Sequence, residues 1–250
     1  MGRMTSIDEV MYSCGLDILH PGGIEKTDEM ARLCKIGKDK KVLDIGSGKG
    51  VTACYLAEKY KCKVIGIDSS EKMVKYAEKM AKEKGLNNKV SVIKADAHKL
   101  PFKEESFDIV LAECTTVLLD KERAFSEFIR VLKHGGHLGD LEMTWKKFPP
   151  QELINIVYEL WEGFKTMTLD EWKNFYRKMG LTDIKAVDFS EKISNMEKTV
   201  MKELGFKGII KMVFNLVLHP SLGRTMYEYR KIFKKYDNYI GYGYIVGKKE

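Results

Sequence analysis

Residues 42–50 read Val-Leu-Asp-Ile-Gly-Ser-Gly-Lys-Gly, and the pattern of apolar residues changes on either side of the first glycine. The apolar run before that glycine is short and β-branched, which is typical of a buried strand. After the last glycine, Ala53, Leu56 and Ala57 follow at helical spacing. A strand that ends in a glycine turn and leads into a helix exposes backbone N–H groups to a ligand at close range. The stretch therefore predicts a ligand site at the carboxyl end of a buried strand.

The spacing of this turn separates three classes of ligand. A phosphate loop that starts at Gly46 requires Gly-Lys-Ser or Gly-Lys-Thr after four intervening residues, and Val51 stands there instead. A dinucleotide fingerprint has its third glycine one residue later than Gly50. Asp44 lies two residues before the first glycine, where a carboxylate would repel a pyrophosphate and suits a cationic ligand. The turn is therefore expected to hold a positively charged molecule.

Short β-rich runs alternate with longer helical patterns along most of the chain, which favours a parallel sheet covered on both faces. We expect a doubly wound α/β fold with a seven-stranded, mostly parallel sheet. The helix that carries Ala124 and Phe128 is expected to run through Leu132 and to end at Gly135-Gly136. The expected strands are 41–45, 63–67, 90–94, 107–112, 137–145, 183–189 and 239–247.

The 250 residues are expected to form a single domain with helical additions. Residues 1–40 would form an N-terminal helical lid, and residues 41–189 together with 238–250 would form the core. Residues 190–237 contain three helical patterns between the last two expected strands. A connection of this length is often a functional lid or binding segment, so we expect a helical cap there.

The Asp-x-Gly-x-Gly-x-Gly run resembles the first motif of class I S-adenosylmethionine-dependent methyltransferases, and the resemblance continues in order over residues 41–145. Asp68 ends the second strand, like the acid that binds both ribose hydroxyls in that family. Residues 95–102 resemble the adenine-binding loop of the family, and residues 106–110 and 130–136 resemble its fourth strand and the turn into the fifth. The chain is most similar to the small-molecule group that includes ubiquinone/menaquinone-biosynthesis and arsenite methyltransferases.

This resemblance implies S-adenosylmethionine as cofactor and S-adenosylhomocysteine as product. The cofactor-binding residues it implies are Asp44, Gly46, Ser47, Gly48, Gly50, Asp68, Ser69, Met73, Asp96, Ala97 and Glu113. Plainer roles stay open for three of the acids. Asp68 could cap the following helix, Asp96 could hold a turn, and Glu113 could face the substrate or solvent.

The candidate catalytic residues are Tyr12, His20 and Glu113, although His20 also suits a loop role before Pro21-Gly22-Gly23. After the fourth strand the chain reads Glu113-Cys114-Thr115-Thr116 in place of the Asn-Pro-Pro-aromatic motif of nucleobase and glutamine N-methyltransferases. That departure argues against those substrates. No metal site is expected, because the histidines lack nearby partners and the five cysteines form no Cys-x-x-Cys pair.

The sequence therefore predicts an enzyme that transfers a methyl group from S-adenosylmethionine to a small molecule held under the cap. The transfer would be an in-line displacement, in which good positioning supplies about 7–11 kcal/mol. The apolar and aromatic residues of the cap predict an apolar or aromatic acceptor. An RNA methyltransferase and a non-catalytic S-adenosylmethionine-binding module stay open as alternatives.

The remaining partners follow from charge and hydropathy. The net charge of +7 motivates the RNA alternative, but no separate basic RNA-binding domain is visible, so RNA is disfavoured and no DNA partner is expected. The longest apolar stretch, residues 209–218, is far short of the roughly 20 residues of a membrane span. With no signal peptide pattern and no disulfide framework, we expect a cytoplasmic protein. The oligomeric state is left open.

Overall fold

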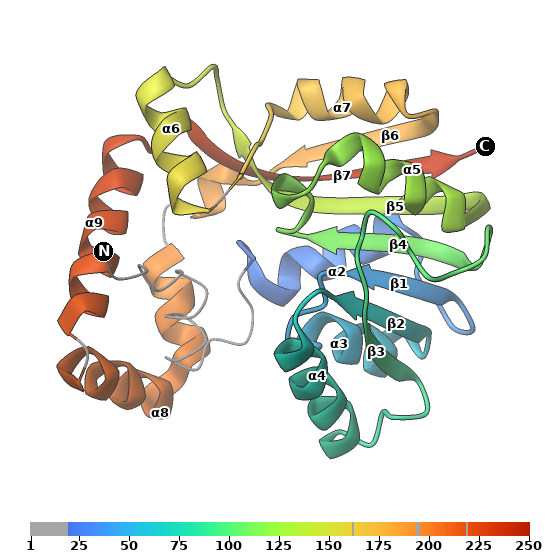
Figure 1. The fold of residues 1–250 in the computed structure, drawn as a ribbon, viewed down its shortest axis with the longest axis horizontal. Coiled ribbons are helices and arrows are strands. Elements are labelled where there is room, and N and C mark those ends of the chain that lie inside the picture. The colour runs from blue at the N-terminus through green and yellow to red at the C-terminus, as the bar shows by residue number, and fades with distance from the viewer. Residues whose placement is uncertain (1–19, 162, 194–195, 219) are drawn as a thin grey trace.

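A computed structural model describes residues 20–161, 163–193, 196–218 and 220–250, and its centre is one seven-stranded sheet (Figure 1). The strand order is β3-β2-β1-β4-β5-β7-β6, and β7 runs antiparallel to both of its neighbours. Helices cover both faces of the sheet, so the predicted doubly wound, mostly parallel fold is confirmed. The strands are β1 (Lys41–Ile45), β2 (Lys63–Asp68), β3 (Val90–Lys94), β4 (Phe107–Glu113), β5 (Leu132–Trp145), β6 (Leu181–Asp188) and β7 (Ile240–Lys249).

The order of the strands creates a switch point between β1 and β4. From β1 the chain winds outward to β2 and β3 and then returns to place β4 on the other side of β1. In open α/β sheets, ligands bind in the crevice at the carboxyl ends of the strands, where the winding direction reverses. The helices around this sheet are α2 (Gly23–Leu33), α3 (Val51–Tyr60), α4 (Glu71–Glu83), α5 (Lys121–Val131), α6 (Gln151–Leu160), α7 (Leu169–Lys178), α8 (Met196–Leu218) and α9 (Pro220–Lys235), with two short 3₁₀ turns, η1 (Thr116–Leu118) and η2 (Ser190–Ile193).

The central strands are buried on both faces, as parallel strands between two helical layers must be. Val42, Leu43 and Ile45 on β1 and the apolar residues of β4 are almost inaccessible to solvent. Aromatic rings fill the space between α5 and α7, where the Phe125 ring lies 4.8 Å from that of Phe175 and 5.2 Å from that of Tyr176. This packing holds the sheet as a rigid base for the residues that follow each strand.

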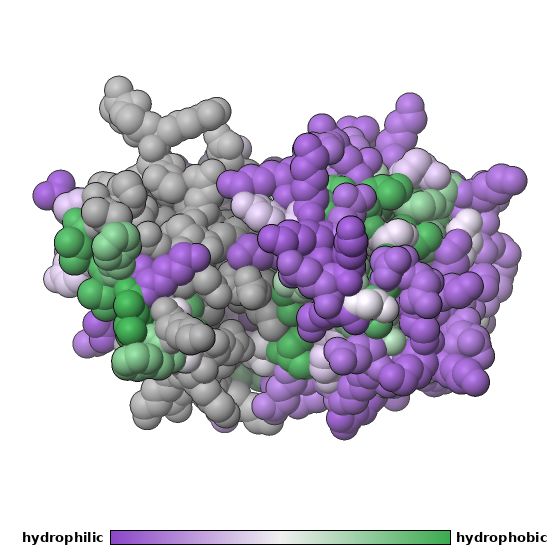
Figure 2. All heavy atoms as spheres, turned by 90° about the horizontal axis from the view of Figure 1, so that it is seen from below, coloured by the Kyte–Doolittle hydropathy of each residue, from purple (hydrophilic) through white to green (hydrophobic). Residues whose placement is uncertain are grey.

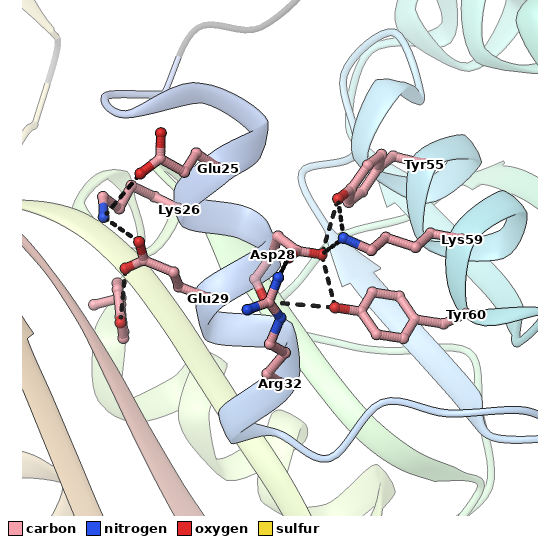
Figure 3. A network of polar contacts seen from close by, with 9 residues as sticks. Glu25, Lys26, Asp28, Glu29, Arg32, Tyr55, Lys59 and Tyr60 are labelled. Atoms are coloured by element: carbon pink, nitrogen blue, oxygen red, sulfur yellow. Dashed lines mark hydrogen bonds and ion pairs between the residues drawn. The ribbon is translucent and has the colours of Figure 1, made fainter.

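Helix α2 is attached to the rest of the domain by a charged network around the buried Asp28 (Figure 3). The Asp28 carboxylate accepts hydrogen bonds from the hydroxyls of Tyr55 (2.8 Å) and Tyr60 (2.7 Å) and pairs with Lys59 and Arg32. Burial alone would raise the pKa of Asp28, but these donors outweigh it and hold that pKa well below its usual value. The network fixes α2 against α3, and α2 in turn positions residues over the carboxyl edge of the sheet.

Two parts of the chain differ from the sequence prediction. Helix α5 ends at Val131, so the prediction of a helix through Leu132 is wrong: Leu132 already pairs with Phe107 in the sheet, and the register shifts before Ile109 pairs with His137. Pairing with β4 therefore overrides the helical spacing of Leu132.

Two helices, α8 and α9, occupy the long connection between β6 and β7, where three helical patterns were predicted. Helix α8 is broken at Gly205, whose φ of 57° and ψ of −176° are not helical, and this break separates the first two predicted patterns. Helices α6, α8 and α9 lie beyond the carboxyl ends of β1 and β4 (Figure 1). The division into lid, core and cap stays a prediction. Within the described ranges, no helix combines the length and apolarity needed to cross a membrane.

Candidate active site

One large cavity of about 980 Å³ opens at the carboxyl ends of β1, β2, β4 and β5. Its volume is near the upper end of the range for ligand pockets, about 300–1,000 Å³. The sequence-predicted residues that line it are His20, Asp44, Gly46, Ser47, Gly48, Asp68, Ser69, Met73, Asp96, Ala97 and Glu113. Residues predicted from separate motifs are thus brought to one site.

The turn after β1 approaches the loop after β4 so closely that only glycine fits at its first position. A Cβ atom on Gly46 would lie 2.2 Å from Thr115 Oγ1, and the φ of Gly46 is +69°. Both the contact and the backbone conformation exclude other residues. The bare backbone of this turn forms part of the cavity wall.

Of the remaining predicted residues, one is described and one lies outside the described part of the chain. Gly50 is absent from the lining of the cavity: a Cβ atom there would lie 2.8 Å from Ala77 Cβ, so this glycine lets α3 pack closely on α4. The close packing of the two helices explains the third glycine of the motif without a ligand. Tyr12 lies outside the described residues.

Asp68 ends β2 and uses both carboxylate oxygens to shape the cavity wall. Its Oδ2 accepts from the backbone N–H of Gly48 (2.9 Å), and its Oδ1 accepts from that of Ser70 (2.8 Å). The cap of α4 is Ser70, whose Oγ accepts from the N–H of Met73 (3.4 Å), so Asp68 is not the capping residue. Each carboxylate oxygen has a second lone pair and can still accept from a ligand hydroxyl.

Asp96 lies at the far end of the same wall, in the loop after β3. Its Oδ1 accepts from the backbone N–H of His98 (2.9 Å) and lies 2.7 Å from the Nδ1 of that ring. These bonds lower the pKa of Asp96. Asp96 therefore holds a turn and lines the cavity at once, and its predicted contact with adenine stays a prediction.

Asp44 is a buried acid under the glycine turn. The pKa of Asp44 is raised to about 7. Burial is the main cause, a hydrogen bond from Ser47 Oγ (2.6 Å) acts in the opposite direction, and the charges of Glu113 and Asp68 add to the rise. A cationic ligand beside these three acids would reverse that repulsion and favour the ionised form. The acids therefore fit a positively charged cofactor.

Glu113 joins the cavity to helices α2 and α3. Its Oε1 accepts from Thr27 Oγ1 (2.7 Å) on α2, and its Oε2 accepts from Thr52 Oγ1 (2.7 Å) on α3. The ring Nε2 of His20 lies 3.2 Å from the same Oε2. The two candidate catalytic residues among the described ones are therefore in direct contact, and the network around Asp28 holds the helix that carries Thr27.

Sequence reasoning missed Glu142, a fully buried acid on β5 that also lines the cavity. Its Oε1 accepts from the backbone N–H groups of Thr115 (3.0 Å) and Thr116 (2.7 Å). Its Oε2, like Oδ2 of the neighbouring Asp140, has no donor within the described part of the chain. Burial raises the pKa of both acids, and the charge of Asp140 raises that of Glu142 further. Burial therefore favours the protonated form of these carboxyl groups.

The remaining wall of the cavity is apolar and aromatic, and sequence reasoning did not assign it. Met143 and Tyr242 come from β5 and β7, Trp161 and Phe164 follow α6, and Phe233 belongs to α9. We call this wall, together with Glu142, the aromatic side of the cavity. The glycine side consists of the turn at residues 46–48 with Asp44, Asp68 and Asp96.

Comparison with known proteins shows which class carries such a site. Residues 42–136 match the model of a family described as "Methyltransferase domain". A norajmaline N-methyltransferase from Rauvolfia serpentina is 31% identical over 70% of this chain and 65% of its own length. An uncharacterized protein from Haemophilus influenzae is 28% identical over 88% of this chain and 87% of its own length.

A solved methyltransferase from Thiobacillus denitrificans, in complex with S-adenosylhomocysteine, matches the fold with a TM-score of 0.75. The alignment covers 98% of this chain and 99% of the solved chain, and the two sequences are 18% identical. Residues 42–136 thus form a methyltransferase domain, and the chain as a whole has the fold of class I S-adenosylmethionine-dependent methyltransferases. The predictions of the fold and of a methyltransferase are confirmed. S-adenosylmethionine as cofactor and a small molecule as substrate belong to the proposal below. The alignment leaves about a third of the norajmaline enzyme unmatched, so the reaction of the whole protein is taken up as a proposal.

Proposed function

We propose that the protein methylates a small molecule that lies against the aromatic side of the cavity while the cofactor lies on the glycine side. The observation that supports this is the continuity of the cavity, which runs from Gly46 and Asp68 to Trp161 and Phe233. When bound, S-adenosylmethionine supplies a methyl group on a positively charged sulfur. The task of the protein is then mainly to align the acceptor with that methyl group for in-line displacement, an effect worth about 7–11 kcal/mol.

The cofactor would be held by groups that suit its parts. The backbone of the turn at Gly46 and Gly48 would receive the amino-acid end, and the free lone pairs of Asp68 would accept from the ribose hydroxyls. Ala97 and Asp96 would flank the adenine. The charges of Glu113 and Asp68 raise the pKa of Asp44, and Asp44 and Glu113 would offset the positive charge of the sulfonium and ammonium groups.

The aromatic side indicates the chemistry of the acceptor. Trp161, Phe164, Phe233 and Tyr242 provide flat apolar surface, and Glu142 is the acid among them. We infer an acceptor with an apolar body and an O–H or N–H group that donates to Glu142. Glu142 and Asp140 would take the proton that such a group loses, because their pKa values are raised by burial.

His20 is the second candidate for that proton. Glu113 lies against Nε2 of the ring, whereas Nδ1 has only a long contact of 3.5 Å with the carbonyl oxygen of Pro21. His20 would take the proton at Nδ1, the ring nitrogen that does not face Glu113. Its place in the cavity wall supports this role.

The proposal is tested by measuring S-adenosylhomocysteine release with panels of amines, phenols and apolar alcohols. Amphiphilic acceptors with an aromatic or alicyclic body are expected to give turnover, whereas nucleosides and short RNA are not. Turnover only with RNA would contradict the proposal. Tight cofactor binding without turnover on any panel would favour the non-catalytic module instead.

A further inference from the structure

Helix α8 presents apolar side chains on two faces. Met212 and Leu216 lie on the face toward α9, where they form a small cluster with Met226. On the outer face, five side chains at helical spacing are 52–79% exposed, and we call them the apolar stripe. The stripe consists of Phe206, Ile210, Val213, Phe214 and Val217. Figure 2 shows hydrophobic surface at the left edge of the molecule, on the side where Figure 1 places α8.

The positive charge of the protein is concentrated around this stripe. Residues 204–235 contain seven Lys or Arg and a single acid, Glu228, a net charge of +6, whereas the whole chain carries +7. Most of the net charge of the chain therefore comes from this segment of α8 and α9. Among the basic residues, Lys211, Arg224, Lys231 and Lys234 are exposed in the structure.

This combination differs from that of an ordinary surface helix, whose outer face is polar. We propose that α8 and α9 dock on an anionic membrane surface, with the apolar stripe buried at the boundary between headgroups and acyl chains. Helices that lie in this interface combine an apolar face with Lys and Arg on the polar side, and each basic residue near the surface adds to the attraction by anionic lipids.

The positive charge of this segment favours an anionic membrane over a second copy of the chain as the partner that covers the stripe. A symmetric dimer through α8 would bring two segments of +6 together, and like charges at an interface are repulsive. An anionic lipid surface attracts the same residues and also buries the stripe. This inference does not depend on the proposed methyl transfer, because membrane binding is measured without turnover.

The test is co-sedimentation of the full-length protein with phosphatidylcholine vesicles, with and without phosphatidylserine. Binding is expected to the anionic vesicles, to fall steeply as salt is raised, and to be weak with phosphatidylcholine alone. The variant Phe206→Ser/Phe214→Ser/Val217→Ser is expected to lower vesicle affinity by about tenfold or more, because it removes apolar side chains that would be buried in the membrane. Tyr76→Ser, at an exposed aromatic position on α4, is the control and should bind as the parent protein does.

A second pair of variants separates the position of charge from its total. Lys231→Glu/Lys234→Glu on α9 is expected to lower affinity for anionic vesicles on the order of tenfold or more. Lys72→Glu/Lys82→Glu on α4 changes the net charge equally, also at exposed positions, and is expected to have little effect. Thermal unfolding and S-adenosylhomocysteine binding, measured on all variants, establish that each one is folded.

Three results would overturn the inference. The first is the absence of binding to anionic vesicles at low salt. The second is an equal loss of binding in both charge-reversal variants, which would indicate attraction by total charge alone. The third is a dimer of the parent protein in solution that the triple serine variant dissociates, because the stripe would then be covered by a second copy.

Discussion

The two sides of the cavity are built in different ways. The glycine side comes from residues 44–97, a stretch of about fifty residues in which each functional group stands at or just after a strand end. The aromatic side comes from β5, β7, α9 and the turn after α6, which are separated by up to a hundred residues of sequence. Local backbone geometry therefore defines the first side, whereas tertiary packing defines the second. Variants on the two sides should accordingly fail in different steps.

The largest effect is expected on the glycine side, from Gly46→Ala. Its Cβ would lie 2.2 Å from Thr115 Oγ1 in a backbone conformation unfavourable to L-residues. We expect the turn to move and S-adenosylhomocysteine affinity to fall by about 100-fold or more, roughly 3 kcal/mol, as measured by calorimetry. Gly85→Ala is the matched control: its φ of +67° is almost the same, but nothing lies within 4 Å of the added Cβ. Equal losses in both variants would show that backbone strain alone matters.

On the aromatic side, Glu142→Gln tests Glu142 as the group that takes the proton of the acceptor. The amide can still accept from the N–H groups of Thr115 and Thr116, but it cannot take a proton from the acceptor. We expect kcat to fall by about 100-fold, as is typical for loss of a general base, while cofactor affinity stays unchanged. The pH–rate profile should also lose a limb, which a purely structural role would not explain. A loss of cofactor binding in the same variant would indicate instead that Glu142 acts on the glycine side of the cavity.

A comparable test of the glycine side is Asp68→Ala, which removes the acceptor for the Gly48 N–H and for any ligand hydroxyl. Loss of charge-assisted hydrogen bonds is expected to weaken cofactor binding by about 2 kcal/mol, or roughly 30-fold. Ser70→Ala is the control, because it removes only the cap of α4 and should lower thermal stability without affecting affinity. Unchanged affinity of Asp68→Ala would argue against a contact with the ribose.

The same contrast explains which features could be predicted from sequence. Asp44, Gly46 and Asp68 each stand at or next to the end of a strand, and short apolar runs in the sequence show where those strands end. Trp161 and Phe233 carry no such marker, because aromatic residues at helical spacing are equally suited to core packing. For Glu142 a signal was present: two acids, Asp140 and Glu142, alternate with Gly139, Leu141 and Met143 in the predicted strand. Such a pattern points both carboxyl groups to one buried face, which is costly without a function.

The errors in the fold have the same origin. Leu132 continues the helical spacing of α5, but its place beside Phe107 in the sheet depends on a register shift that no local pattern encodes. Gly50 is not such an error, but it too is constrained by a distant residue, because a Cβ there would lie 2.8 Å from Ala77 Cβ on the next helix. In both cases a partner distant in the sequence decides the outcome. The break of α8 at Gly205 is the opposite case, because the local sequence, a glycine between two helical patterns, already indicates it.

The smallest expected effect concerns Asp44, whose protonation should differ between the cofactor-free and the cofactor-bound protein. In the ligand-free protein this carboxyl group keeps its proton to a pH of about 7, whereas in the unfolded chain it ionises near its ordinary pKa of 3.8. The folded state therefore binds more protons across that interval, and this group's contribution makes the free energy of unfolding fall as pH rises from 4 to 7.

Cofactor affinity should change in the opposite direction, because a cation beside Asp44 favours the ionised form. We expect S-adenosylmethionine affinity to rise by at most about tenfold between pH 6 and pH 8, with proton release on binding below pH 7. Calorimetry in buffers of different ionisation enthalpy measures that release. Asp44→Asn, which retains an acceptor for Ser47, should abolish both trends. If the variant kept the proton release, the titrating group would have to be another acid of the cavity, with Glu113 the first to examine because it already raises the pKa of Asp44.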